Sequence, residues 1–326
     1  MTVVAPPAVT RSCSRTDVPG RTIRLVANPA AGRGRGHKAL PQVVRRLRAA
    51  GHRLHVHEAT SFADARLRTV QSVAASGAGD ALVVVGGDGM AHLGLNACSG
   101  TEVPLGVVPV GTGNDFCRGT GAARSATAAT RAIARGRTRL VDLSEVTGRL
   151  LEGAERRWVG SVVSTGYDAR VNRRANAFPC SLGPASPLAY AGIALAELAT
   201  FEPMHYRLEV DGLVRELPAM FVAVGNAGYF GGGMHICPRA DVTDGLLEVM
   251  VIHPVSRATL LRLLPCAFTG GHVKDPAVEH LRARVVALSG TDETGRALFA
   301  MADGEELGDT PVTVSAVPGA LRLFVP

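Results

Sequence analysis

The chain of 326 residues has few aromatic side chains, no closely spaced cysteines and no long apolar run. Aromatic residues make up 4% and do not interleave with the arginines, so the stacking platform of a single-strand nucleic-acid binder is missing and we expect no nucleic-acid partner. The six cysteines form no C-x-x-C pair, which excludes a disulfide framework or zinc site and indicates reduced thiols in a cytoplasmic protein. The longest apolar stretch, residues 188–201, is too short to span a membrane.

Positive charge is concentrated near the N-terminus. Residues 1–57 hold eleven Arg or Lys and one acid, Asp17, whereas the whole chain has a net charge of +7. Such a surface can meet anionic lipid headgroups or nucleotide phosphates, and an ordinary solvated basic face explains it equally well. Residues 1–20 contain no apolar h-region, so we expect a disordered tail there rather than a signal peptide.

A strand that ends in glycines and one carboxylate is the most informative stretch. Residues 81–85 form a short valine-rich run, typical of a strand buried on both faces, and the run ends at Gly86-Gly87-Asp88-Gly89. Ligands of open α/β sheets bind at the carboxyl ends of strands, where glycines let backbone N–H groups approach an anion. Asp88 therefore suits a Mg²⁺ ion held against phosphate, although it could instead cap the following helix.

Two more junctions of this kind occur in the first half of the chain. Strand-like residues 22–27 run into a glycine-rich loop at residues 28–36, and residues 105–110 run into the loop at residues 111–116. The first is not a Walker A loop, because Lys38 is followed by Ala39. Parallel strands present such loops at one edge, so we predict a parallel-sheet α/β domain over residues 21–145. Its other elements are expected at residues 38–50, 54–58, 62–76, 90–99, 125–135 and from 139.

The pattern changes near residue 145, where alternating helices and strands give way to strand-rich segments. We predict a second, mainly antiparallel β domain over residues 146–318, with Asp211-Gly212 as a hairpin turn. Helices are expected at residues 187–200 and 256–268. The expected strands are residues 158–164, 206–210, 219–224, 246–252, 285–289, 298–302, 312–317 and 321–325.

Five motifs, in this order, resemble the catalytic domain of the diacylglycerol kinase and sphingosine kinase family of lipid kinases. They are N-P-A-A-G at residues 28–32, G-G-D-G at 86–89, G-T-G-N-D-F at 111–116, the segment from G-G-G-M to D-G-L-L at 231–247, and D-G-E at 303–305. The resemblance covers residues 21–326. It implies an α/β nucleotide domain followed by a β-sandwich, with a last strand at about residues 319–326 returning to the first domain.

The resemblance also implies ligands and their residues, with ATP and Mg²⁺ as cofactors. The implied ATP contacts are Asn28, Pro29, Ala30, Ala31, Gly32, Thr60, Gly86, Gly87, Asp88, Gly89, Met90, Ala91, His92 and Thr112. The late D-G-E implies Glu305 as the base for the lipid hydroxyl, with Asp303 as its partner or a metal contact, although a hairpin turn would explain both acids. The implied ligands of a structural Mg²⁺ are Asp241, Asp244 and the carbonyl of Leu246, where a turn alone is an equal alternative.

Some residues depart from the family pattern or keep two interpretations. Met90, His92 and Leu93 stand where the family usually has threonine, asparagine and glutamate. Met90 thereby removes a hydroxyl and Leu93 a carboxylate, whereas His92 keeps a hydrogen-bonding group. We interpret Asp115 as a helix cap rather than a catalytic group, and Phe230 as core rather than as part of a lipid cleft.

We therefore predict an ATP-dependent lipid kinase that phosphorylates a hydroxyl of diacylglycerol or a related lipid by direct transfer. The basic face would let a cytoplasmic protein visit the anionic inner surface of the membrane as a peripheral partner. A kinase for a sphingoid base or NAD and a non-catalytic lipid or nucleotide sensor remain alternatives, and a homodimer is left open.

Overall fold

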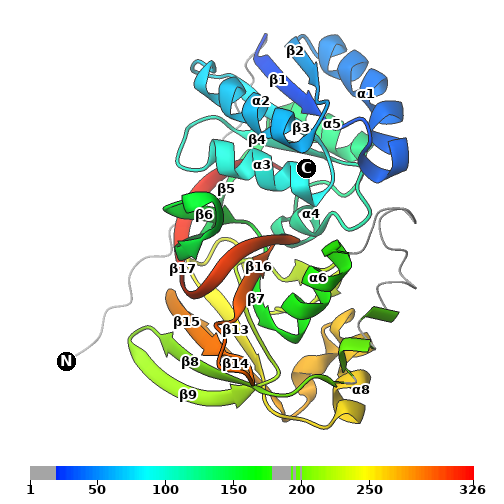
Figure 1. The fold of residues 1–326 in the computed structure, drawn as a ribbon. Helices are drawn as coiled ribbons and strands as arrows, with labels where there is room; N and C mark the ends of the chain where they lie inside the picture. The colour runs from blue at the N-terminus through cyan, green and yellow to red at the C-terminus, as the bar shows by residue number, and fades with distance from the viewer. Residues whose placement is uncertain (1–19, 178–191, 194–195, 199) are drawn as a thin grey trace, which may run out of the picture.

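The computed structural model describes residues 20–177, 192–193, 196–198 and 200–326. Residues 1–19 of the predicted tail and most of the predicted helix at residues 187–200 lie outside the described residues. Within the described ranges, no helix is long and apolar enough to cross a membrane. Figure 1 shows the first half of the chain, in blue and cyan, above a strand-rich second half in green to red.

The first half alternates strands with helices. Its elements are β1 (Thr22–Ala27), α1 (Ala31–Ala49), β2 (Arg53–Glu58), α2 (Phe62–Ala74), β3 (Ala81–Gly86), α3 (Asp88–Cys98), β4 (Leu105–Pro109), α4 (Asp115–Thr120) and α5 (Ala126–Arg135). The strands pair in parallel in the order β4-β3-β1-β2. The short α4 lies where Asp115 was interpreted as a helix cap, but Asp115 is its first residue and Asn114 is the N-cap. Residues 32–34 have left-handed φ values, so the regular part of α1 begins only after the glycine-rich loop.

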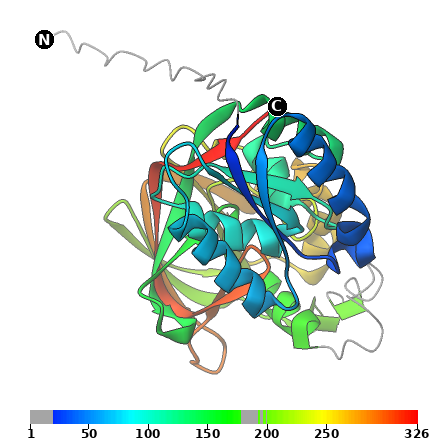
Figure 2. The same cartoon turned by 90° about the horizontal axis from the view of Figure 1, so that it is seen from above.

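Helices cover both faces of this parallel sheet because its central strands are apolar on both sides. Every residue of β3 is buried. Leu25 and Val83 pack with the core beside α1 and α5, whereas Val26 and Val84 pack with the core beside α3. Figure 2, seen from above, shows the blue strands between helices on either side. The sheet is therefore held rigidly, and its loop edge is the part that is free to bind a ligand.

The second half is mainly antiparallel, which confirms the predicted fold class. Its strands are β5 (Thr138–Leu150), β6 (Arg156–Val159), β7 (Val162–Gly166), β8 (Met204–Val210), β9 (Leu213–Ala219), β10 (Phe221–Gly225), β11 (Tyr229–Phe230), β12 (Met234–His235), β13 (Leu247–Ile252), β14 (Val278–Ala283), β15 (Val285–Thr291), β16 (Phe299–Ala302) and β17 (Glu305–Phe324). The helices of this half that the structure describes along their whole length are α6 (Tyr167–Ala177) and α8 (Arg257–Ala267), and short 3₁₀ turns lie at Leu151–Gly153 and Gly271–Lys274.

Several predicted boundaries differ from the structure. The predicted strand at residues 158–164 is two strands, because Gly160 and Ser161 interrupt the strand conformation between β6 and β7. The two predicted strands at residues 312–317 and 321–325 are one continuous β17. The elements α6, β9 and β14 were missed. The hairpin at Asp211-Gly212 is confirmed: it joins β8 to β9, and its two φ values of 49° and 87° are those that a type I′ turn requires.

Two long strands join the halves of the molecule. β5 crosses the predicted domain boundary between residues 145 and 146 and pairs along β17. β17 begins beside β16 and β15, and at its other end Leu323 pairs in parallel with Leu105 of β4. The D-G-E motif at residues 303–305 forms the turn into β17, which begins at Glu305. This strand therefore fixes the turn relative to the loop edge of the parallel sheet (Figure 1).

Candidate active site

The three glycine-rich loops converge on one cavity of about 310 Å³, which we call the loop cavity. It is lined by Asn28, Ala30, Ala31, Gly32, Arg33, Phe62, Gly87, Asp88, Gly89, Met90, Gly111 and Thr112. Nine of the fourteen predicted ATP contacts are among these residues. The other five, which lie outside the lining, are Pro29, Thr60, Gly86, Ala91 and His92. Thr60 is exposed and its hydroxyl bonds Asp64 at 3.3 Å.

The first and third loops touch each other, and this contact depends on a glycine. Gly32 has a φ of +61°, and a Cβ atom there would lie 1.9 Å from the carbonyl oxygen of Val110. Arg35 ties the same loops together by donating from Nη2 to the Gly111 oxygen at 2.7 Å and from Nε to the Gly32 oxygen at 3.1 Å. Arg35 therefore shapes the loop cavity, whereas the exposed Arg33 lines it.

A second cavity of about 150 Å³, which we call the carboxylate cavity, adjoins the first at Asp88. It is lined by Asp88, His92, Leu95, Asp115, Phe116, Ser161, Tyr229, Phe230, Gly231, Gly232, Asp303 and Gly304. Residues from the G-G-D-G, G-T-G-N-D-F, triple-glycine and D-G-E motifs thus meet in one place. Asp88, Asp115 and Asp303 line the carboxylate cavity together, and Asp88 also lines the loop cavity.

Asp303 is held in place by three hydrogen bonds. Its side chain is 6% exposed and accepts from the N–H groups of Gly160 and Ser161 at 3.2 and 3.1 Å. His92 Nδ1 lies 3.1 Å from Asp303 Oδ2 and joins α3 to the D-G-E turn. His92 therefore belongs to the carboxylate cavity and not to the loop cavity where we predicted it. Asp303 therefore ties the D-G-E turn to α3 and to the backbone between β6 and β7, and most of its acceptor capacity is used.

Asp88 and Asp115 are two neighbouring carboxylates at the start of helices. Asp88 Oδ1 accepts from the Phe116 N–H at 3.2 Å, and Asp115 Oδ2 accepts from the Gly232 N–H at 2.6 Å. Burial raises the pKa of Asp88, and the nearby charge of Asp303 raises it further against the Phe116 hydrogen bond. Burial and the charge of Asp88 raise the pKa of Asp115 to about 6. Asp303 thus makes the charged form of Asp88 less favourable, and Asp88 does the same to Asp115, so a cation would relieve this repulsion.

Asp88 and Asp115 are the residues that would hold a divalent cation in this cavity. In the described part of the chain, the buried Oδ1 of Asp115 accepts no hydrogen bond, and Arg118 Nε lies 3.9 Å from it. Such an orphaned oxygen is costly unless a ligand satisfies it. The described residues hold no group of three or more His, Cys, Asp or Glu arranged for a metal, so phosphate oxygens would complete the coordination, as Mg²⁺ prefers. Asp115 is thus a candidate ligand that the sequence interpretation as a helix cap missed.

We expect Gly113→Ala to impair binding of Mg²⁺ with a nucleotide. A Cβ atom on Gly113 would lie 2.9 Å from Asp88 Oδ2, 3.2 Å from Asp115 Oδ2 and 3.1 Å from Gly232 Cα, so it would occupy the space between the two carboxylates. Titration calorimetry with Mg·ATP should show affinity reduced roughly tenfold or more, as expected when polar groups lose their partner. Gly77→Ala is the matched control, because the nearest atom to its Cβ is 4.0 Å away. Equal affinities for both variants would contradict this prediction.

The other predicted acid, Glu305, is an exposed residue at the start of β17 that lines neither cavity. Desolvation raises its pKa, the charge on His92 lowers it, and Asp303 raises it again. Glu305 is therefore near the carboxylate cavity, and its role as the base stays a prediction. Met90 and Leu93, which depart from the family pattern, are 3% and 6% exposed and pack in the core of the first domain.

The predicted structural Mg²⁺ site is arranged as a turn with an ion pair. Asp241 Oδ1 accepts from the N–H and hydroxyl of Thr243, and Asp244 Oδ1 accepts from the Leu246 N–H. The guanidinium of Arg282 pairs with Asp244 Oδ2. Because an arginine already supplies positive charge to Asp244, this arrangement does not fit a metal ion at Asp241, Asp244 and the Leu246 carbonyl, and we assign none there.

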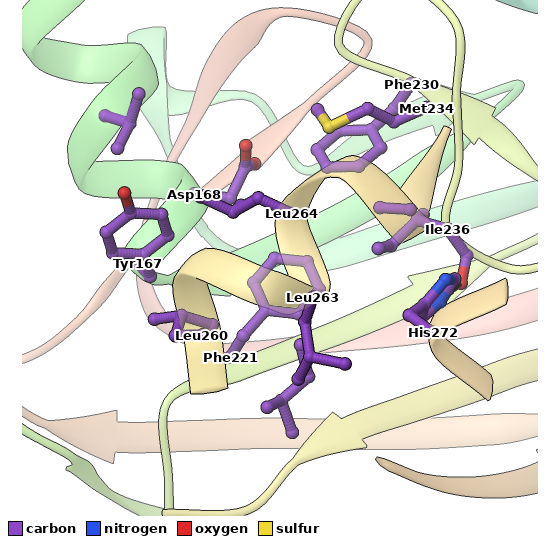
Figure 3. Close-up of a pocket in the computed structure, with 13 residues that line it drawn as sticks. Tyr167, Asp168, Phe221, Phe230, Met234, Ile236, Leu260, Leu263, Leu264 and His272 are labelled. Carbon is purple, nitrogen blue, oxygen red and sulfur yellow. Dashed lines mark hydrogen bonds between the residues drawn. The ribbon is translucent and has the colours of Figure 1, made fainter. Parts of the chain in front are cut away.

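An apolar pocket adjoins the carboxylate cavity at Phe230, which lines both. Figure 3 shows this pocket between α6, α8 and the strands beneath them. It is lined by Tyr167, Asp168, Val171, Phe221, Phe230, Met234, Ile236, Ile252, Leu260, Leu263, Leu264, Ala267 and His272. The sequence interpretation missed it, although Gly166-Tyr167-Asp168 repeats the pattern of a buried strand followed by glycine and an acid. Asp88 thus lines the loop cavity and the carboxylate cavity, and Phe230 lines the carboxylate cavity and the apolar pocket.

Among the residues that the structure describes, Asp168 is the one carboxylate lining the apolar pocket, and we expect it to make stability depend on pH. Burial raises its pKa to about 7, against hydrogen bonds from Ser164 Oγ at 2.8 Å and Asn172 Nδ2 at 3.0 Å. A folded pKa above the unfolded value of 3.8 means that folding stability falls as pH rises from about 4 to about 7. The melting temperature of Asp168→Asn should therefore fall less than that of the wild type between pH 5 and pH 8. Parallel profiles would contradict this prediction.

Comparison with known protein families gives two matches that together span most of the chain. Residues 22–146 match the family model described as the diacylglycerol kinase catalytic domain. Residues 161–325 match the family model described as the YegS C-terminal NAD kinase beta sandwich-like domain. The resemblance inferred from the five motifs is therefore confirmed, and the two matches lie on either side of the region where the sequence pattern changes.

Individual relatives match over nearly their full length. A diacylglycerol kinase of Mycobacterium tuberculosis (strain CDC 1551 / Oshkosh) is 34% identical over 306 residues, which cover 93% of this chain and 95% of the relative. A protein of Stenotrophomonas maltophilia (strain K279a) is named probable lipid kinase YegS-like. It is 29% identical over 315 residues, which cover 93% of this chain and 96% of the relative. The solved structure of a diacylglycerol kinase from Bacillus anthracis str. Sterne shares the fold, with a TM-score of 0.69 and 20% identity. The match covers 94% of this chain and 97% of that structure.

Proposed function

The chain belongs to the family of bacterial diacylglycerol kinases and YegS-like lipid kinases, and we propose that it transfers the γ-phosphoryl group of ATP to a hydroxyl of diacylglycerol or a related lipid. The observation that carries this proposal is that the three cavities share lining residues, Asp88 between the first two and Phe230 between the last two. A glycine-rich cavity at strand ends suits a triphosphate, a central cavity with carboxylates suits the reacting groups, and an apolar pocket suits an acyl chain.

The proposed reaction needs positioning and charge control rather than covalent catalysis. The lipid hydroxyl oxygen forms a bond to the γ-phosphorus, the bond to the ADP oxygen breaks, and the hydroxyl proton moves to a carboxylate. Asp88 and Asp115 would hold a magnesium ion bound with ATP, and that ion would neutralise phosphate charge. The loop cavity orients the phosphates through backbone N–H groups, while Arg33 adds positive charge at the wall.

Asp88 is placed better than Glu305 to act on the acceptor hydroxyl. A base must lie within hydrogen-bond reach of the proton it removes. Asp88 lines both the loop cavity and the carboxylate cavity, whereas Glu305 lines neither. We therefore propose Asp88 as the group at the reacting centre, with Asp303 fixing the turn opposite it through His92. Glu305 would act on the approach to the site.

The apolar pocket indicates the class of acceptor. Twelve of its thirteen lining residues carry no carboxylate, and Asp168 is buried among them. Part of an acyl chain would gain free energy by entering this pocket of about 70 Å³, whereas the polar and charged NAD molecule would lose hydration there. Lys38, Arg45 and Arg48 are exposed on α1 and could hold the protein at an anionic bilayer from the cytoplasmic side. Such peripheral binding, like a homodimer, is open to test by vesicle flotation and light scattering.

The proposal is tested by offering labelled ATP with diacylglycerol, sphingosine and NAD in parallel and identifying the labelled product. We expect label in phosphatidic acid and little in the other two products. Label in a phosphorylated sphingoid base or in NADP would identify one of the other kinases. ATP binding without any labelled product from lipid would show a sensor that does not turn over.

A further inference from the structure

Phe62 is an aromatic side chain left exposed at the wall of the loop cavity. It is the first residue of α2, and its side chain is 49% exposed. Among the large apolar side chains that stay exposed in the described part of the chain, only Phe62 and Phe268 are aromatic. Phe62 lines the loop cavity, and its Cε2 atom lies 3.6 Å from where a Cβ on Gly89 would be. An apolar ring is thus held over the G-G-D-G loop without a partner on its outer face.

The backbone beneath this ring is firmly anchored. Ser61 caps α2 by accepting from the Asp64 N–H at 3.0 Å. Asp64 Oδ2 in turn accepts from the Thr60 N–H at 3.0 Å and lies 2.9 Å from His57 Nε2. The hydrogen bonds from His57 and Thr60 hold the pKa of Asp64 down to about 2, so the carboxylate stays charged and the anchor stays intact. The segment that carries Phe62 is therefore preorganised.

The rest of the loop cavity offers a different chemistry. Its other lining residues are glycine, alanine, asparagine, threonine, arginine, aspartate and one buried methionine. Glycine-rich backbone and arginine suit phosphates, but they give no flat apolar surface for a purine base. Phe62 gives such a surface, because every base has a π-face that can stack on an aromatic ring.

We propose that Phe62 is the residue on which the nucleotide base stacks when ATP occupies the loop cavity, so that the base and the triphosphate are bound by separate walls. This inference rests on the proposed function, since it takes ATP as the ligand. Stacking reads the face of the base and not its edges, so Phe62 contributes affinity and orientation with little discrimination between adenine and guanine.

The test compares ATP with inorganic tripolyphosphate, which has no base. Titration calorimetry of Phe62→Ala should show ATP affinity reduced roughly five- to a hundredfold, the range for loss of one base–aromatic contact, with tripolyphosphate affinity unchanged. Leu67→Ala is the matched control, because Leu67 is 53% exposed on the same helix and does not line the cavity. It should leave both affinities unchanged, and Phe62→Tyr should restore ATP binding.

Fluorescence gives an independent measurement. The chain has one tryptophan, so Phe62→Trp adds a single second fluorophore at the cavity wall. ATP should quench the added emission and tripolyphosphate should not, with the wild type as the reference for Trp158. Equal ATP affinity in Phe62→Ala and wild type would overturn the stacking inference and leave the kinase proposal standing. Equal losses for ATP and tripolyphosphate would also overturn it, and a wild type that binds neither would overturn both proposals.

Discussion

Asp88→Asn is expected to lose at least about a hundredfold in phosphoryl transfer while the folded protein becomes more stable at neutral pH. Turnover is lost because Asp88 lines both the loop cavity and the carboxylate cavity. An amide at this position can neither take a proton nor bind Mg²⁺ as a carboxylate does. The gain follows because burial raises the pKa of Asp88, so its charge opposes folding at pH 7. An asparagine oxygen still accepts from the Phe116 N–H and carries no charge.

The stability gain should depend on pH in a defined direction. The folded pKa of Asp88 lies above the unfolded value of 3.8, so the carboxyl opposes folding only where the unfolded chain has lost its proton. The difference in melting temperature between Asp88→Asn and wild type, measured without Mg²⁺, should therefore be largest near pH 7 and shrink toward pH 4. A variant that is both inactive and less stable would show that Asp88 serves the fold rather than the reaction.

Two matched carboxylate variants sharpen this experiment. Asp142 is 1% exposed and accepts from the N–H groups of Gly245 and Gly319, each at 2.7 Å. Asp142→Asn should lower the melting temperature, because an amide nitrogen would face one of those donors. Glu305→Gln should reduce turnover less than Asp88→Asn does. The reverse order would return the role of base to Glu305, as the D-G-E motif alone suggests.

Filling the apolar pocket with Ala267→Phe is expected to reduce kcat/KM for diacylglycerol roughly tenfold or more, with ATP affinity unchanged. Ala267 is 5% exposed at the end of α8 and lines the pocket, so a phenyl ring there takes space that we assign to an acyl chain. Activity measured against diacylglycerols of increasing chain length should show the largest losses for the longest chains.

Two other positions on α8 provide the opposite change and the control. Leu264 also lines the pocket, so Leu264→Ala enlarges it and should shift the preference toward longer chains (Figure 3). Leu261 is 47% exposed and does not line the pocket, so Leu261→Phe should leave the preference unchanged. Equal chain-length profiles for all three variants would show that the acyl chain binds elsewhere, without touching the case for ATP at the loop cavity.

The sequence by itself determined the features that depend on neighbours in the chain. Three features are local patterns of this kind, and each fixes the backbone around it. They are the valine run before Gly86, the loops that follow β1 and β4, and the turn at Asp211-Gly212. The helices predicted at residues 125–135 and 256–268 are observed as α5 and α8. The convergence of glycine-rich loops followed from one further rule, that parallel strands share an edge.

Only the tertiary structure decided which side chains meet across the halves. His92 and Asp303 are 211 positions apart, and their contact depends on how β17 is placed beside β4 and β16. The orphaned oxygen of Asp115 and the apolar pocket around Asp168 likewise depend on packing between segments that no local pattern relates. Burial and partners set the charge, orientation and reach of each side chain, and these arise only when the whole chain is folded.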